Sequence, residues 1–135
     1  MLFTRNLFLL ASICLAQLGA IFAQKAPLLS REANEAERML LRGDSLFESS
    51  RPVAALAMYR GAEERSFDPC QVARARLGIA NIHVQSQNYT LAERTLGLTQ
   101  DGLLACSEEN RLQQSKLAAN LWMQLQQEGK AIAIL

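Results

Sequence analysis

His83 is the only histidine in the 135-residue chain, so no second imidazole is present to share a metal ion with it. A catalytic triad would require His83 to meet a positioned nucleophile and an acid. His83 instead holds the same place in a helical pattern as Leu46 and Trp122, where side chains pack. We expect it to be a packing residue inside a helical hairpin.

The acidic residues include two adjacent pairs, Glu63 with Glu64 and Glu108 with Glu109. Neighbours in sequence splay apart on a helix, so such pairs do not converge on one reacting atom. We expect them on solvated faces and in helix caps. The sequence also has no glycine-rich phosphate loop, metal-ligand spacing or nucleophile elbow. It predicts a protein that is not an enzyme and that holds no metal and no cofactor.

Cys70 and Cys106 lie at or just before the start of predicted helices, at equivalent ends of successive helical units. Cys14 lies in the predicted leader, so these are the two cysteines of the mature chain, and an even number in an oxidising compartment favours pairing. A disulfide needs Cα atoms within about 7 Å, however, whereas packed helices lie about 8 to 10 Å apart. The sequence leaves two alternatives open, a Cys70–Cys106 disulfide or two free, partly buried thiols.

Residues 1–23 have the layout of a secretory signal peptide. Arg5 is their only charged residue, and an apolar stretch follows that ends at Ala23. A membrane anchor would need about 20 predominantly apolar residues, and this stretch is shorter and is interrupted by Gln17. We expect export to the periplasm or the medium, cleavage near Ala23, an unstructured segment over 24–29 and no membrane span in the mature chain.

Charge and composition exclude several classes of partner. The 14 Lys and Arg residues, less Arg5 of the leader, equal the 13 Asp and Glu residues, so the mature chain is formally neutral. No basic field is available for a nucleic acid backbone, and no lysine-rich amphipathic helix suggests a membrane surface. Ala, Leu, Gln, Arg and Glu are abundant, and runs of β-branched residues are absent, which favours an all-α fold.

Apolar residues recur at helical spacing in three hairpins, over about 30–66, 70–101 and 107–135, which together form the predicted domain 30–135. Thr90 with Glu93 has the pattern of a capping box for the fourth helix. We expect that helix to bury Leu91, Ala92, Leu96 and Leu98 and to end at Asp101-Gly102. The sequence predicts about five helices and a short C-terminal sixth, arranged as stacked antiparallel hairpins.

A spacing of twelve residues between a small residue and an alanine occurs three times. The pairs are Gly43 with Ala55, Ala80 with Ala92, and Ala119 with Ala131. Large side chains lie three residues after each small one, and large side chains again lie four residues after each alanine. Self-similarity at a period of about 37 residues is typical of helical repeats, which commonly act as binding scaffolds.

This pattern resembles the tetratricopeptide repeat (TPR) family over residues 36–135. The first repeat has Met39, Gly43, Leu46, Ala55, Tyr59, Ala62 and Pro69; the second has Ile79, Ala80, His83, Tyr89, Ala92 and Leu96; the third has Ala118, Ala119, Trp122, Ala131 and Leu135. The small residues are 37 and 39 positions apart, against 34 in the family. Leu77-Gly78 resembles the Leu-Gly dipeptide of the family but lies two residues too early in the pattern. Alignment on Gly78 would put Thr90 at the position of the family's alanine, so we align the second repeat on Ala80.

The resemblance implies a groove lined by the first helix of each hairpin. By register, the candidate partner-binding residues are Leu40, Asp44, Phe47, Leu77, Asn81, Val84, Lys116, Asn120 and Met123, with Glu37, Glu48, Arg74, Gln85, Gln113 and Gln124 beside them. The apolar members would seat side chains of a peptide, and the asparagine amides would bind its backbone. Leu40 and Asp44 stand where some chaperone-binding relatives have cationic or amide groups, so that carboxylate clamp is not expected. The alternative is that these residues only cover the core.

The leading hypothesis is therefore a non-catalytic, exported scaffold that binds a protein or peptide segment. The rival hypothesis is a structural subunit, or an incomplete repeat array, that self-associates or docks through its apolar C-terminal end into a larger envelope assembly. Helical repeats bury their faces on neighbours, yet the chain has no charged residue after Lys130. We expect residues 131–135 either to pack back along the preceding helix or to meet another molecule, such as a second copy.

Overall fold

The computed structural model describes residues 30–126, 130 and 133–135, and the chain divides into two units, Met1–Glu32 and Ala33–Leu135. The predicted leader over 1–23 and the segment 24–29 lie outside the described residues. The described residues form helices and no strand, which confirms the all-α class. All contacts discussed below lie within Ala33–Leu135.

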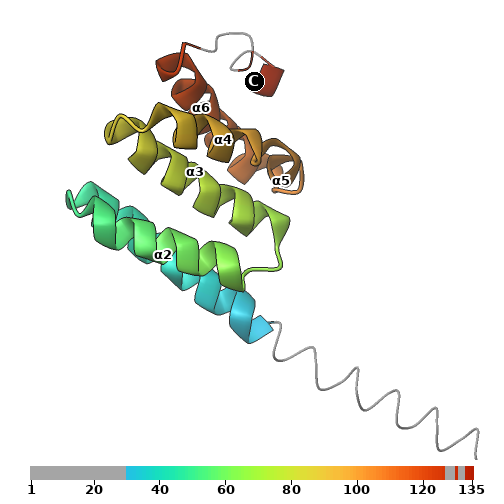
Figure 1. Ribbon diagram of the computed structural model, residues 1–135. Helices are drawn as coiled ribbons and strands as arrows, with labels where there is room; N and C mark the ends of the chain where they lie inside the picture. The colour runs from blue at the N-terminus through green and yellow to red at the C-terminus, as the bar shows by residue number, and fades with distance from the viewer. Residues whose placement is uncertain (1–29, 127–129, 131–132) are drawn as a thin grey trace, which may run out of the picture. The chain divides into compact units, whose positions relative to one another are not determined.

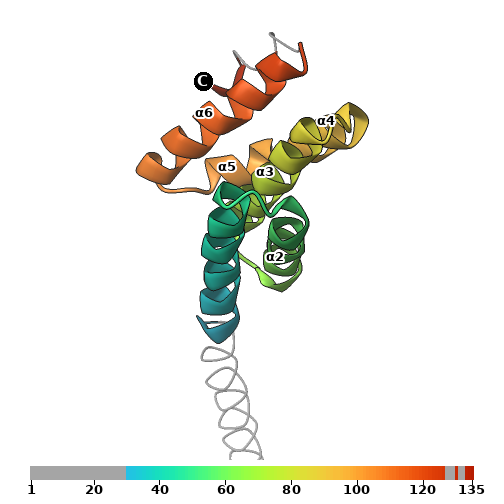
Figure 2. The same cartoon turned by 90° about the vertical axis from the view of Figure 1, so that its left-hand side faces the viewer.

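Six helices form the described part of the chain. They are helix 30–48, α2 (Pro52–Arg65), α3 (Pro69–Gln85), α4 (Tyr89–Gly97), α5 (Gln100–Leu104) and α6 (Glu108–Gln124). Figure 1 shows α3 between α2 and α4. Figure 2 shows helix 30–48 and α6 on one side and α2 and α4 on the other, with α3 between them.

The core consists of two clusters that meet on α3. One cluster joins helix 30–48 and α2 to one side of α3 through Ala75, Ile79 and Ile82. The other joins α4, α5 and α6 to the opposite side of α3 through Leu77 and Ala80, among others. Because α3 is covered on both sides, its apolar residues are spread around the helix rather than confined to one stripe.

Local sequence explains where α2 and α3 begin. Each has a proline in its first turn, Pro52 and Pro69, where the missing N–H needs no partner. Asp68 caps α3 with its carboxylate, which accepts the N–H of Cys70 at 2.9 Å. α6 begins where predicted, with Ser107 at the N-cap position and two glutamates in the first turn.

Three helices end in the same left-handed turn. Ser50, Gln87 and Gln126 have φ angles of 58, 59 and 60°. After helix 30–48 and after α3, the hydrogen bonds are those of a Schellman motif: Ser50 N–H to Phe47 O and Arg51 N–H to Leu46 O, then Gln87 N–H to Val84 O and Asn88 N–H to His83 O. These turns are 37 and 39 residues apart, the same intervals as in the sequence pattern. The backbone therefore repeats in phase with the sequence.

The fourth helix differs from the prediction at its end. α4 ends at Gly97, and Asp101-Gly102 lies inside the separate helix α5. Gly102 permits this arrangement, because a Cβ atom there would lie 2.6 Å from the carbonyl oxygen of Pro69 and 2.8 Å from Cβ of Ala73. A glycine that sequence reasoning assigned to a chain break is thus the residue that lets α5 approach α3.

The start of α4 was also predicted wrongly. The helix begins at Tyr89, and its N-cap residue Asn88 makes no side-chain capping bond, so Thr90 and Glu93 form no capping box. The left-handed turn at Gln87 explains why α4 begins earlier than predicted, because the backbone leaves this turn at Asn88, which is the N-cap residue of α4. Of the residues predicted to be buried on this helix, Ala92 and Leu96 are buried, whereas Leu91 and Leu98 are 41% and 58% exposed.

The described part of the C-terminal tail packs back on the domain. Lys130 pairs with Glu93 at 3.2 Å and lies 4.5 Å from the centre of the Trp122 ring. Ile134 packs against the cluster that contains Trp122, whereas Leu135 is 77% exposed. Residues 131–132 lie outside the described residues.

Candidate functional site

A cavity of about 380 Å³ lies on the face shared by helix 30–48, α3 and α6. Helix 30–48 contributes Leu40, Asp44, Phe47 and Glu48; α3 contributes Arg74, Gly78 and Asn81; α6 contributes Gln113, Gln114 and Leu117; α2 contributes Tyr59. We call this cavity the groove pocket. Its size is near the lower end of ligand pockets, about 300 to 1,000 Å³.

Four of the nine candidate binding residues line the groove pocket: Leu40, Asp44, Phe47 and Asn81. Leu77 and Val84 do not, because they are 0% and 7% exposed and belong to the core between α3, α4 and α6. Their assignment to a groove was wrong for a physical reason: α3 is covered on both sides. Lys116, Asn120 and Met123 are exposed on α6 outside the pocket.

On α6 the lining residues are Gln113, Gln114 and Leu117. Only Gln113 was in the predicted lining, because the third repeat matches the family pattern only in part. Tyr59 and Gly78 were also missed as lining residues. The Leu77-Gly78 dipeptide was a visible signal, but alignment on Ala80 gave Gly78 no role.

Tyr59 forms the wall of the pocket between helix 30–48 and α3. A Cβ atom on Gly43 would lie 2.7 Å from the Tyr59 ring, and one on Gly78 would lie 2.6 Å from it. The ring is therefore held between two glycines on different helices, and the residue as a whole is only 3% exposed. Neither glycine can carry a side chain unless the ring moves.

The hydroxyl group of Tyr59 donates a hydrogen bond of 2.7 Å to Oδ1 of Asp44. Burial raises the pKa of Tyr59 well above its ordinary value near 10, and the hydrogen bond to Asp44 and the negative charges of Asp44 and Glu48 raise this pKa further. Arg74 lowers it to a smaller extent. The hydroxyl therefore stays protonated and acts as a fixed donor, not as a base.

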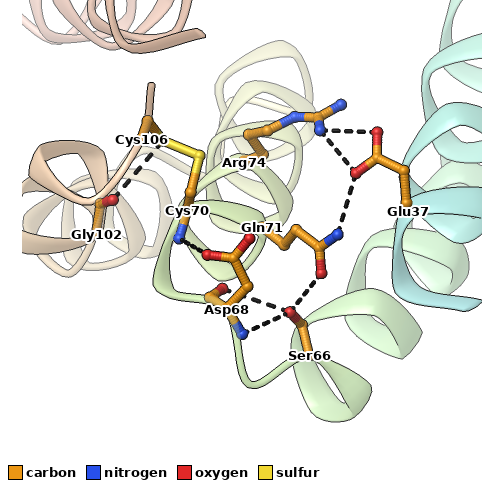
Figure 3. The surroundings of a disulfide bond; sticks show 8 residues. All are labelled: Glu37, Ser66, Asp68, Cys70, Gln71, Arg74, Gly102 and Cys106. Carbon is orange, nitrogen blue, oxygen red and sulfur yellow. Dashed lines mark hydrogen bonds and ion pairs between the residues drawn. A yellow bond between two sulfur atoms is a disulfide. The ribbon is translucent and has the colours of Figure 1, made fainter. Parts of the chain in front are cut away.

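A polar chain connects the pocket to the neighbouring disulfide (Figure 3). Arg74 binds both carboxylate oxygens of Glu37 at 2.9 Å. Gln71 donates to Glu37 at 3.2 Å and accepts from the hydroxyl of Ser66 at 2.7 Å. These contacts join helix 30–48 to the N-terminal end of α3, so they fix the position of Arg74 at the rim of the groove pocket.

Cys70 and Cys106 are joined by a disulfide, with their Cα atoms 4.9 Å apart. The two cysteines come this close because Cys106 lies between α5 and α6, and α5 approaches α3 at Gly102. The spacing between packed helices therefore does not apply to this pair. The bond ties the start of α3 to the segment that leads into α6, and both helices line the groove pocket.

His83 lies away from the groove pocket. It lines a second depression, of about 260 Å³, together with Arg60, Arg94 and Leu91. Partial burial, and then the positive charge of Arg60, lower the pKa of His83. Glu63 and Thr95 line the same depression, but the Glu63 carboxylate binds Arg76 at 2.7 Å and the Thr95 hydroxyl donates to the carbonyl of Leu91 at 2.8 Å.

Within residues 30–126, 130 and 133–135, no group of three or more His, Cys, Asp and Glu residues has the arrangement of a metal site. In the same residues, no helix is both long and apolar enough to cross a membrane. No protein-family model, curated protein or solved structure matches the chain.

Proposed function

We propose that this protein is a non-catalytic, exported scaffold of TPR-like helical hairpins that binds a protein or peptide segment in the groove pocket. The observation that carries the proposal is the composition of this pocket on the shared face of helix 30–48, α3 and α6. Leu40, Phe47 and Leu117 give it apolar walls, while Asn81, Gln113 and Gln114 bring amide groups to the same cavity. Extended segments are recognised by this combination, in which apolar pockets hold side chains and amides bind the backbone.

Export is supported by the layout of residues 1–23 and by the paired state of Cys70 and Cys106, since disulfides persist in oxidising compartments. Mass spectrometry of the protein from its native cells should find a mature N-terminus at Gln24. A free thiol at either Cys70 or Cys106 in that sample would contradict export to an oxidising compartment.

A photo-cross-linking residue placed at Gln113 tests the groove. Gln113 lines the pocket, and Asn120 lies on the same helix outside it, so Asn120 is the matched control position. In native cells we expect a discrete adduct from position 113 and none from position 120. Equal adducts from both positions would contradict a groove site.

Amide removal gives the second arm of this test. Asn81→Ala with Gln114→Ala should weaken the adduct, because each lost amide hydrogen bond costs about 1 kcal/mol, or roughly fivefold in affinity. Circular dichroism should show unchanged helical content, since both side chains lie at the pocket surface. An adduct that is as strong in this variant as in the natural chain would place the binding surface elsewhere.

A further inference from the structure

Asp44 and Glu48 place two carboxylates on the wall of the groove pocket, one helical turn apart on helix 30–48. Like charges at this spacing repel each other. Asp44 accepts a hydrogen bond from the neutral Tyr59 hydroxyl, and neither carboxylate forms an ion pair with any described residue. The pair therefore carries negative charge that the described part of the chain leaves uncompensated.

The charges on the other side of the pocket do not offset this pair. Arg74 is the only cationic residue among those that line the pocket. Its guanidinium already binds both carboxylate oxygens of Glu37, at 2.9 Å each. Glu37 does not line the pocket, so the positive charge of Arg74 is balanced by a residue other than Asp44 and Glu48. Burial is the largest cause of the raised pKa of Tyr59, and the negative charges of Asp44 and Glu48 raise this pKa further.

The remaining lining of the pocket suits a long side chain with an apolar stem. The apolar part of the lining consists of Leu40, which is 1% exposed, together with Phe47, Leu117 and the Tyr59 ring. Lysine and arginine bury their methylene stems against such surfaces and keep the charged end at polar groups. Aromatic rings at the same site add an attraction for cations.

We propose that the groove pocket recognises an arginine or lysine side chain of the segment bound there, with Asp44 and Glu48 receiving its cationic end. This inference rests on the proposed groove function and adds the chemistry of the partner to it. Charge complementarity carries the choice, because two carboxylates and an apolar floor in one small cavity match a basic side chain and disfavour an acidic one.

Four peptides that differ at one position test the inference. They have the sequence Ala-Leu-Xaa-Leu-Ala with both ends blocked, and Xaa is Arg, Lys, Gln or Glu. By calorimetric titration of the mature chain, we expect the Arg and Lys peptides to bind roughly three- to tenfold more tightly than the Gln peptide, with the Glu peptide weakest. Raising the salt concentration should reduce the difference, because exposed charges are screened.

A charge-neutral variant tests the same point from the protein side. Asp44→Asn with Glu48→Gln keeps the shape of both side chains and the acceptor for Tyr59, and it should abolish the preference for basic peptides. Glu64→Gln with Glu109→Gln removes the same charge at exposed positions outside the pocket, and this control should keep the preference.

The outcomes separate the two proposals. If the Arg and Gln peptides bind equally, and their binding is still weakened by Asn81→Ala with Gln114→Ala, the preference for cations is overturned and the groove function stands. A Glu peptide that binds most tightly also overturns the preference. If none of the four peptides binds, both proposals are overturned.

Discussion

Tyr59 is the residue on which the groove wall depends, because its ring is held between Gly43 and Gly78. Gly78→Ala should lower the free energy of unfolding by about 1 to 3 kcal/mol, since the new methyl group meets the ring at 2.6 Å. Gly97→Ala is the matched control, because a Cβ atom there meets nothing within 4 Å. The gain in helix propensity is shared by both variants, so the difference between their urea midpoints isolates the steric effect. Equal midpoints would contradict this packing.

Tyr59→Phe removes the hydrogen bond to Asp44 and should lower the free energy of unfolding by about 0.5 to 1.5 kcal/mol at neutral pH.

The natural chain should also lose stability as the pH rises above about 10, because the unfolded tyrosine ionises there while the raised pKa keeps the folded one protonated. Tyr59→Phe lacks this contribution, so its stability should fall less between pH 8 and pH 11. Urea melts at the two pH values measure the difference. Tyr89→Phe, at an exposed tyrosine, controls for the loss of a hydroxyl group.

At the scale of elements, the disulfide secures α5 and the start of α6 against α3. Cys70 and Cys106 are 36 residues apart in sequence, and closing a loop of this size stabilises a domain by about 2 to 4 kcal/mol. Cys70→Ser with Cys106→Ser should lower the melting temperature, and the reduced natural chain should melt close to this variant. A reduced chain that melts like the oxidised one would show that the helices hold this region without the bond.

Some helices could be predicted from their own sequence, and others could not. Helix 30–48, α2, α3 and α6 could be predicted because each has regular apolar spacing and a recognisable start or end. α5 could not, since its five residues include Gly102 and it depends on contact with α3. The groove pocket lies on the three helices that the sequence indicated, but Leu77 is buried in the core, and α6 lines the pocket with Gln113, Gln114 and Leu117. The exposure of a side chain depends on which other helices cover its own helix, and the sequence of a single helix does not contain this information.

At the scale of the whole molecule, the C-terminal tail determines whether the domain is self-contained. Ile134→Ala should lower the free energy of unfolding by about 1 to 2 kcal/mol, because this side chain is partly buried against the cluster around Trp122. Leu135→Ala is the matched control and should not change stability, since Leu135 is 77% exposed. Thermal melts over a range of protein concentrations distinguish the two sites.

The opposite pattern would support the rival structural hypothesis. If the C-terminal end mediates self-association, Leu135→Ala should convert a dimer to a monomer in size-exclusion chromatography with light scattering. Ile134→Ala would then affect stability only at concentrations where the dimer forms. A chain that is monomeric at high concentration, and whose stability depends on Ile134 alone, would exclude this route to assembly.

The three left-handed turn residues are sites where the stability of the protein can be raised without changing the groove pocket. Ser50, Gln87 and Gln126 each adopt a conformation that costs a non-glycine residue about 1 kcal/mol, and none of them lines the groove pocket. Replacing each by glycine should therefore raise the free energy of unfolding, and gains at sites that act independently should add. The chain could thus tolerate costly substitutions at Asp44, Asn81 or Gln114 once its three turns are relaxed, so that new binding preferences can be selected on the groove without loss of the fold.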